Sequence, residues 1–129
     1  MSNSYGRLGM LAQDRWDYAA AESLYRRALE ISERIGDQAG IATAYDALGG
    51  LNEALGNLDQ AVGCRVNALA IRLEIGIATA GDAEPLTGLR RQLGRDRFRT
   101  GALASALDEQ SVINLMEMLD QQEGQTAGN

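Results

Sequence analysis

Few side chains in this sequence could perform acid–base, nucleophilic or metal chemistry. The chain has no histidine, which excludes imidazole bases and imidazole metal ligands and leaves every serine without a histidine to activate it. The single cysteine, Cys64, stands in the middle of a helical pattern, where no helix terminus activates its thiol. We interpret it as a small buried apolar residue.

The glutamates follow a helical spacing that ion pairing explains. Glu22, Glu30 and Glu33 face solvent on one predicted helix, and Arg26 and Arg34 follow them at distances that favour pairs four residues apart. Without lysine, the chain also lacks the key residue of a Walker-type phosphate loop. We therefore expect no catalysis, no cofactor and no bound metal.

Five arginines cluster near the C-terminal end and could contact phosphates. They are Arg90, Arg91, Arg95, Arg97 and Arg99. Phe98 is the only aromatic residue among them, and the chain carries a net charge of −6, which opposes general binding to nucleic acid. We expect these arginines to pair with Glu84, Asp96 or neighbouring acids, and we expect no nucleic-acid partner.

The N-terminus has no basic flank leading into an apolar segment, so it is not a signal peptide. No apolar run approaches the ~18 residues of a membrane span. These features predict a cytoplasmic protein with no membrane partner.

An internal repeat of 40 residues organises the chain. Shifting the sequence by this length superposes small and large residues in the same order without a gap. The matched pairs are Tyr5 with Tyr45, Leu8 with Leu48, Gly9 with Gly49, Ala21 with Ala61, Ala28 with Ala68, Leu29 with Leu69, Ile31 with Ile71, and Gly36 with Gly76.

Apolar spacing within each copy is helical. It predicts helices over about 3–14 and 18–35 in a first unit (3–36), and over 39–55 and 58–75 in a second unit (39–76). Asp17 is placed to cap the second helix, and Gly36 to end it. Close antiparallel packing needs small residues opposite bulky ones. We expect Gly9, Ala21 and Ala28 to form the holes, and Leu8, Leu24 and Tyr25 the knobs.

The run LGMLAQDRWDYAAAESLYRRALEISERIGD resembles a tetratricopeptide repeat, and the resemblance covers residues 3–76. It implies an all-α fold, an α-solenoid of antiparallel helix pairs. Trp16 departs from the pattern, because it stands where the turn usually has glycine, as Gly56 does. Arg65 replaces the aromatic residue that Tyr25 supplies, so we expect the second unit to pack less tightly. The long period resembles repeats near the C-termini of large bacterial signalling ATPases and regulators, which implies a piece of such a protein.

The resemblance also implies a function, the binding of a peptide or helix in a concave groove lined by the first helix of each pair. The corresponding positions are Arg7, Met10, Gln13, Asp14, Thr43, Asp46, Gly50 and Glu53. Some family members grip a C-terminal carboxylate with basic residues here, which Asp46 and Gly50 rule out for this chain. Three carboxylates predict a mildly acidic groove that prefers a basic or neutral peptide. The alternative is that these positions are solvated helix faces.

Residues 77–129 diverge from the repeat. We expect a degenerate third unit (83–107), with helices from Pro85 to Leu93 and from Arg97 to Leu107, followed by a capping helix (109–122) that starts at Asp108. The residues expected to face inward are Phe98, Ala102, Leu103, Val112, Leu115, Met116 and Leu119. Residues 1–122 thus form one domain, and 123–129 form a disordered tail.

The sequence allows two alternatives for Trp16 and two for the outer edge of the first repeat. Trp16 either folds over the turn to cover Tyr18 or Leu11, or stands exposed as an anchor for a partner. The chain begins inside a repeat, where Met10 and Leu11 face outward, so it is either the end of a longer array or a homodimer or larger oligomer formed through this edge. Self-assembly is accordingly the alternative to peptide binding as the function.

Overall fold

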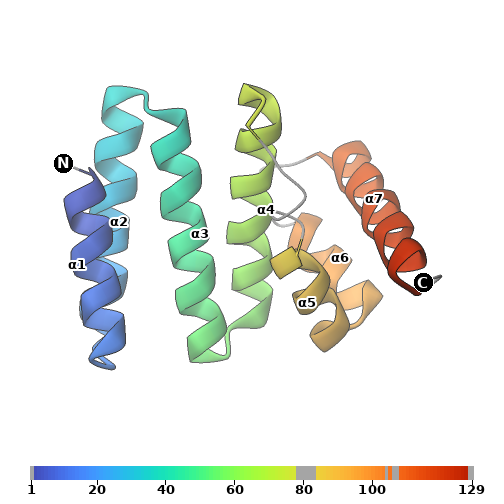
Figure 1. The fold of residues 1–129 in the computed structure, drawn as a ribbon, viewed down its shortest axis with the longest axis horizontal. Helices are drawn as coiled ribbons and strands as arrows, with labels where there is room; N and C mark the ends of the chain where they lie inside the picture. The colour runs from blue at the N-terminus through green and yellow to red at the C-terminus, as the bar shows by residue number, and fades with distance from the viewer. Residues whose placement is uncertain (1, 78–83, 104, 106–107, 128–129) are drawn as a thin grey trace.

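The computed structural model describes residues 2–77, 84–103, 105 and 108–127, and this part of the chain contains helices and no strand (Figure 1). The helices are α1 (Ser2–Asp14), α2 (Tyr18–Ile35), α3 (Gln38–Leu55), α4 (Leu58–Ile75), α5 (Glu84–Leu93), α6 (Arg95–Leu103) and α7 (Glu109–Ala127). The predicted all-α class is confirmed.

Local side-chain chemistry sets the ends of the repeat helices. The Asp17 carboxylate accepts a hydrogen bond from the Ala20 amide at 3.2 Å and caps α2, as predicted. Asp37 caps α3 in the same way, through the Gly40 amide at 3.0 Å. At the other end of α2, Gly36 has a φ of +73°, a left-handed conformation that costs glycine little. The caps therefore hold the hairpins in the register that the repeat predicts.

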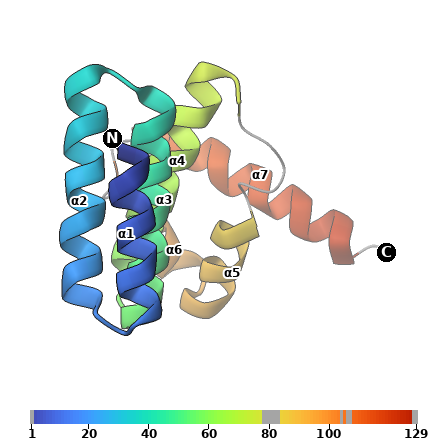
Figure 2. The same cartoon turned by 60° about the vertical axis from the view of Figure 1, so that its left-hand side comes forward.

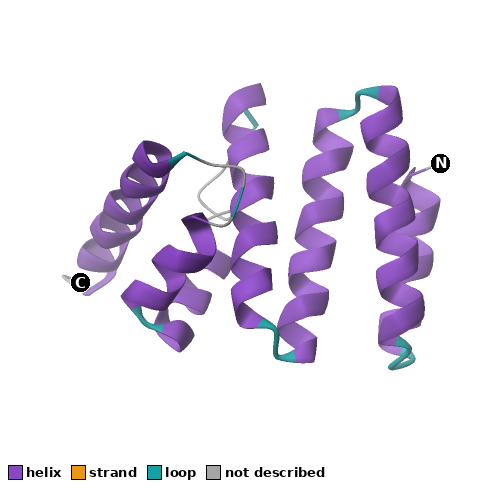
Figure 3. Ribbon diagram, turned by 180° about the vertical axis from the view of Figure 1, so that it is seen from behind, coloured by secondary structure: helices purple, strands orange, loops and turns teal. Residues whose placement is uncertain are grey.

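Consecutive helices from α1 to α4 pack antiparallel, and α2 lies against α3, so the two hairpins stack into one array (Figures 1 and 3). The helices α5, α6 and α7 gather beyond α4. Seen from the side, α2 and α7 lie at opposite ends of the array (Figure 2). This arrangement is an α-solenoid with a modified C-terminal end.

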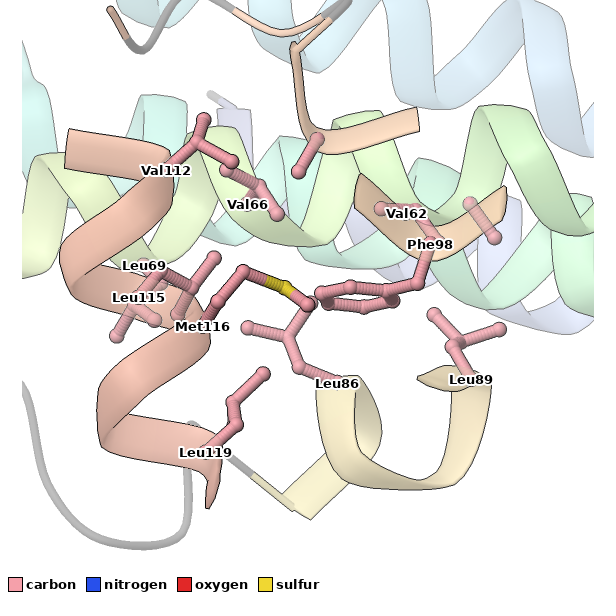
Figure 4. Close-up of a cluster of buried hydrophobic side chains, with 12 residues drawn as sticks. Val62, Val66, Leu69, Leu86, Leu89, Phe98, Val112, Leu115, Met116 and Leu119 are labelled. Carbon is pink, nitrogen blue, oxygen red and sulfur yellow. The ribbon is translucent and has the colours of Figure 1, made fainter. Parts of the chain in front are cut away.

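Two hydrophobic cores flank α4. The smaller core lies between α1, α2 and α3, and its buried residues are Ala21, Tyr25, Leu48 and Leu51. The larger core lies between α4 and the C-terminal helices. Figure 4 shows Phe98 of α6 lying between Met116 of α7 and the leucines Leu86 and Leu89 of α5. Their positions make α4 a wall shared by both cores.

The small residues predicted to form holes are packed against neighbouring helices as expected, but one of the bulky residues predicted to form knobs is exposed. A Cβ atom on Gly9 would lie 2.5 Å from the Tyr25 ring, so only glycine lets α2 approach α1 this closely. Ala21 and Ala28 are buried. Leu8, predicted as a knob, is instead 49% exposed, because none of the described helices covers that side of α1. The close approach of α1 and α2 therefore depends on the absence of a side chain at Gly9.

The third helix pair differs from the prediction at its end. The helix expected from Arg97 to Leu107 starts at Arg95 and ends at Leu103, and residues 104, 106 and 107 lie outside the described part. Phe98 and Ala102 are buried as expected, whereas Leu103, predicted to face inward, is 41% exposed, because one position after the buried Ala102 it points to a different side of the helix.

The capping helix is longer than expected. Its start is confirmed, because the Asp108 carboxylate accepts from the Ser111 amide at 2.7 Å. Its end is not, since α7 continues to Ala127 and includes 123–127, expected to be a disordered tail. A polar composition does not by itself stop a helix, because glutamate and glutamine have high helix propensities. The four inward positions of this helix are buried as predicted, namely Val112, Leu115, Met116 and Leu119.

Candidate functional site

The predicted binding positions fall on α1 and α3. Arg7, Met10 and Asp14 are exposed on α1, and Thr43 is exposed on α3, where its hydroxyl donates to the Ala39 carbonyl at 3.0 Å. Gln13 is half-buried, and its side-chain carbonyl accepts from the Tyr25 hydroxyl at 3.0 Å. Burial, with Asp14 nearby, raises the pKa of Tyr25, which keeps this hydroxyl protonated.

The three remaining positions, Asp46, Gly50 and Glu53, lie beside arginine side chains of α4. Arg65 donates to the Glu53 carboxylate at 2.7 Å and to Asp46 at 3.4 Å, and Arg72 also pairs with Asp46. The Arg65 side chain lies flat on α3, so a Cβ on Gly50 would lie 3.5 Å from its guanidinium. These contacts neutralise two of the three carboxylates that predicted an acidic groove. The expected preference for a basic peptide therefore loses most of its basis.

A concavity that none of these positions forms lies elsewhere in the described part of the chain. A groove of about 800 Å³ runs between α2 and α4, with α3 as its floor and α6 at one end. Its apolar lining comes from Leu29 of α2 and from Tyr45, Leu48, Leu51 and Leu55 of α3. Leu48 and Leu51 are buried, and Leu55 is the large apolar residue that is most exposed among them. None of the eight predicted binding positions lines it.

The two charged rims of this groove are each neutral. On α2, Arg26 donates to Glu22 at 2.9 Å. On the other side, Arg97 of α6 pairs with Asp59 of α4 at 2.9 Å. Both pairs are largely exposed, so each contributes little to stability. Their effect is to present an apolar floor between rims without net charge.

Cys64 lies in the wall of this groove. Burial raises the pKa of its thiol, and this effect outweighs the lowering by Arg26, by the Asn52 amide and by Arg65. The Asn52 amide lies 3.9 Å from the sulfur and also donates to the Leu48 carbonyl at 3.0 Å. The thiol is therefore protonated at neutral pH, and Cys64, predicted to be a small buried apolar residue, is half-buried.

The outer edge of α1 is a second candidate surface. Leu8 and Leu11 are 49% and 52% exposed, whereas their equivalents one repeat later, Leu48 and Leu51, are 6% and 1% exposed beneath α2. Met10 is exposed beside them, as predicted. This edge therefore exposes the positions that α2 covers in the second unit.

Trp16 combines features of both predicted alternatives. Its ring meets the Tyr18 ring edge-on, with centroids 6.2 Å apart, yet the side chain remains 79% exposed. Its φ is +66°, the left-handed conformation that Gly56 adopts in the second unit with a φ of +80°. The exposed alternative describes the structure better, and the turn geometry explains why the family pattern has glycine there.

Four of the five clustered arginines form ion pairs, as predicted, but with acids other than Glu84 and Asp96. Arg90 and Arg95 both pair with Asp120 of α7, and Arg99 lies 3.9 Å from Glu109. The sequence pointed to nearby acids, whereas the actual partners are distant in the chain. These pairs join α5 and α6 to α7.

Sequence reasoning missed the groove between α2 and α4. Its floor uses the same leucines that signal a core, so the pattern does not distinguish a covered leucine from one that lines an open groove. The described residues include no group of three acidic or cysteine side chains that could hold a metal ion. They also include no helix that is both long and apolar enough to cross a membrane.

Comparison with known proteins identifies the repeats. A family model described as "Tetratricopeptide repeat" matches residues 1–74, more than half of the chain. No curated protein and no solved structure matches the chain. The matched segment contains the four helices of the two hairpins.

Proposed function

The chain belongs to the tetratricopeptide repeat family, and on that premise we propose that it is a non-enzymatic module that binds a peptide or helix of a partner protein. Repeats of this family generally mediate protein–protein interactions. Stacked helix pairs suit this task, because they present an extended surface without a dedicated chemical centre.

The groove between α2 and α4 is the proposed binding site. The observation that carries this proposal is the groove itself, about 800 Å³ with a leucine floor. Leu55, at the end of α3, exposes a large apolar side chain into it. Burying such side chains yields ~25 cal/mol per Å² of apolar area.

The rims indicate which segment fits. Because Glu22 is paired with Arg26, and Asp59 with Arg97, a strongly charged peptide gains no net attraction there. We propose an uncharged amphipathic segment with two or more large apolar side chains on one face. Of the basic or neutral peptides predicted from the sequence, this proposal retains the neutral ones.

The face of α1 and α3 is a second proposed site for the same function. It rests on the family's use of these positions and on the exposure of Met10 and Thr43. Asp46 and Glu53 contribute less to this proposed site, because each already forms an ion pair with an arginine of α4.

A displayed library of random peptides, selected against the full chain, tests the groove. We expect uncharged peptides to be enriched and Leu55→Asp to weaken their binding at least tenfold. The control is Leu73→Asp, at a leucine that is 59% exposed, compared with 44% for Leu55, and that lies outside this groove; this variant should bind as the parent does. Enriched peptides that ignore Leu55→Asp but lose affinity on Thr43→Arg would move the site to the α1 and α3 face. The absence of any enriched peptide would contradict the function.

Self-assembly through the outer edge of α1 is the second candidate function. The exposure of Leu8 and Leu11, compared with the burial of Leu48 and Leu51, favours it. Light scattering over a concentration series should show a homodimer or a larger species. A folded monomer at the highest soluble concentration would exclude it.

A further inference from the structure

The outer edge of α1 places charges beside its exposed leucines. Arg7 and Asp14 are seven positions apart, two turns of helix, and therefore lie on one face, with Met10 and Leu11 between them. Both charged side chains are exposed, and neither forms an ion pair with another described residue. Glu22 and Glu30 on α2, by contrast, are each paired with an arginine.

An ordinary neighbouring repeat does not suit this edge. The residue equivalent to Arg7 one repeat later is Ala47, which is half-buried against the core beneath α2. A helix that covered α1 as α2 covers α3 would bury the Arg7 guanidinium. Such burial is unfavourable unless the covering helix supplies a carboxylate. The occupant of this edge must therefore carry an acid at a matching position.

A second copy of the chain supplies that acid. We propose that two copies pair through antiparallel α1 helices about a two-fold axis that passes between Met10 and Leu11. In this register, Arg7 of each copy lies opposite Asp14 of the other. A two-fold interface repeats every contact, so one matched pair becomes two. Leu11 of each copy meets Met10 of the other at the crossing.

The charges fix the register, and the apolar residues drive association. Leu8, Met10 and Leu11 lose their water on pairing. A shift of α1 along its partner moves Arg7 away from Asp14, so it loses both ion pairs at once. This inference rests on the self-assembly proposed above and adds its geometry.

Charge reversal at the two positions tests the register. Arg7→Asp alone and Asp14→Arg alone each place like charges opposite one another twice, so we expect the dimer dissociation constant to rise at least about tenfold. Mixing the two single variants should restore the dimer, as a heterodimer with two matched pairs. The double variant R7D/D14R should also dimerise on its own.

Sedimentation equilibrium measures these constants, with circular dichroism to confirm that each variant is folded. Arg27→Asp makes the same charge change at an exposed position of α2 and should leave the dimer intact. Parent chains that stay monomeric would overturn both this geometry and self-assembly. A parent dimer that Arg7→Asp leaves unchanged, or single variants that do not combine, would overturn the geometry alone.

Discussion

The Arg65 guanidinium donates to the Glu53 carboxylate at 2.7 Å, in the place where, one repeat earlier, the Tyr25 hydroxyl donates to Gln13 at 3.0 Å. Each of these side chains also lies on a glycine, Arg65 on Gly49 and Tyr25 on Gly9. The two repeats thus solve one packing problem with different chemistry. The sequence predicted looser packing at Arg65, but the ion pair shows what holds this side chain in place.

Placing the tyrosine and glutamine of the first repeat at positions 65 and 53 tests whether the two pairs are equivalent. Arg65→Tyr alone leaves the half-buried Glu53 carboxylate without its donor, so we expect the free energy of unfolding to fall by about 1–2 kcal/mol. Adding Glu53→Gln supplies the neutral acceptor that Gln13 provides and should recover most of the loss. Urea unfolding of both variants measures the difference. A double variant no more stable than the single one would argue against the equivalence.

Gly9 and Gly88 should respond oppositely to alanine. A Cβ on Gly9 would overlap the Tyr25 ring, so we expect Gly9→Ala to lower the free energy of unfolding by about 1–3 kcal/mol. Gly88, inside α5, has nothing within 4 Å of the same atom, so Gly88→Ala should raise stability by up to about 1 kcal/mol. Thermal unfolding compares the two. If the two substitutions changed stability equally, α1 and α2 would not pack as closely at Gly9 as the structure indicates.

Trp16 should be replaceable by glycine with a gain in stability. Its left-handed φ costs a residue with a Cβ about 1 kcal/mol, and its exposed ring returns little burial. We expect Trp16→Gly to raise the melting temperature and Gly56→Ala to lower it. The parent's tryptophan emission should be red-shifted. A blue-shifted maximum would indicate that the ring is covered, by its own chain or by a second copy.

Cys64 should be slow to react with alkylating reagents. Because burial raises the pKa of the thiol, less thiolate is present at any given pH than in a free cysteine, whose pKa is about 8.5. The rate of alkylation should therefore rise with pH through a midpoint above that value. The urea-unfolded chain serves as the control and should titrate like free cysteine. Peptides selected on the groove should slow the reaction further.

Asp120 should contribute a stability that acid removes. Hydrogen bonding from Arg90, with help from Arg95, lowers the pKa of Asp120 in the folded chain. Its contribution is therefore complete above the ordinary aspartate pKa of about 3.9, and it disappears as pH falls through the lowered value. Asp120→Asn should melt below the parent at neutral pH, and the gap should close towards acid. Asp120→Asn combined with Arg90→Gln should melt no lower than Arg90→Gln alone if the ion pair is the source of this stability.

How much the sequence predicts depends on whether a contact is local in the chain or follows from the order of small and large residues in the repeat. The helix ends at Asp17 and Gly36 follow from local chemistry, and so does the close approach at Gly9. The ion pair of Asp46 does not follow from local chemistry, because its partner Arg72 comes from another helix. The sequence shows both charges, but only the fold shows that they meet.

Surfaces were harder to predict than cores for a related reason. Leu48 and Leu8 occupy the same position of the repeat, and the pattern assigns them one role. The structure buries the first beneath α2 and leaves the second exposed. Exposure depends on the neighbouring repeat, so the repeat alone does not encode it.

The position of α4 between two cores divides the molecule unevenly. Val62 and Val66 anchor it to the C-terminal helices, and only partly buried residues such as Cys64 face the smaller core. The hairpin of α1 and α2 can therefore open while the rest of the array stays folded. In hydrogen exchange, we expect its amides to lose protection first and those of α4 last, so that the end offered to other molecules is also the one that yields most easily.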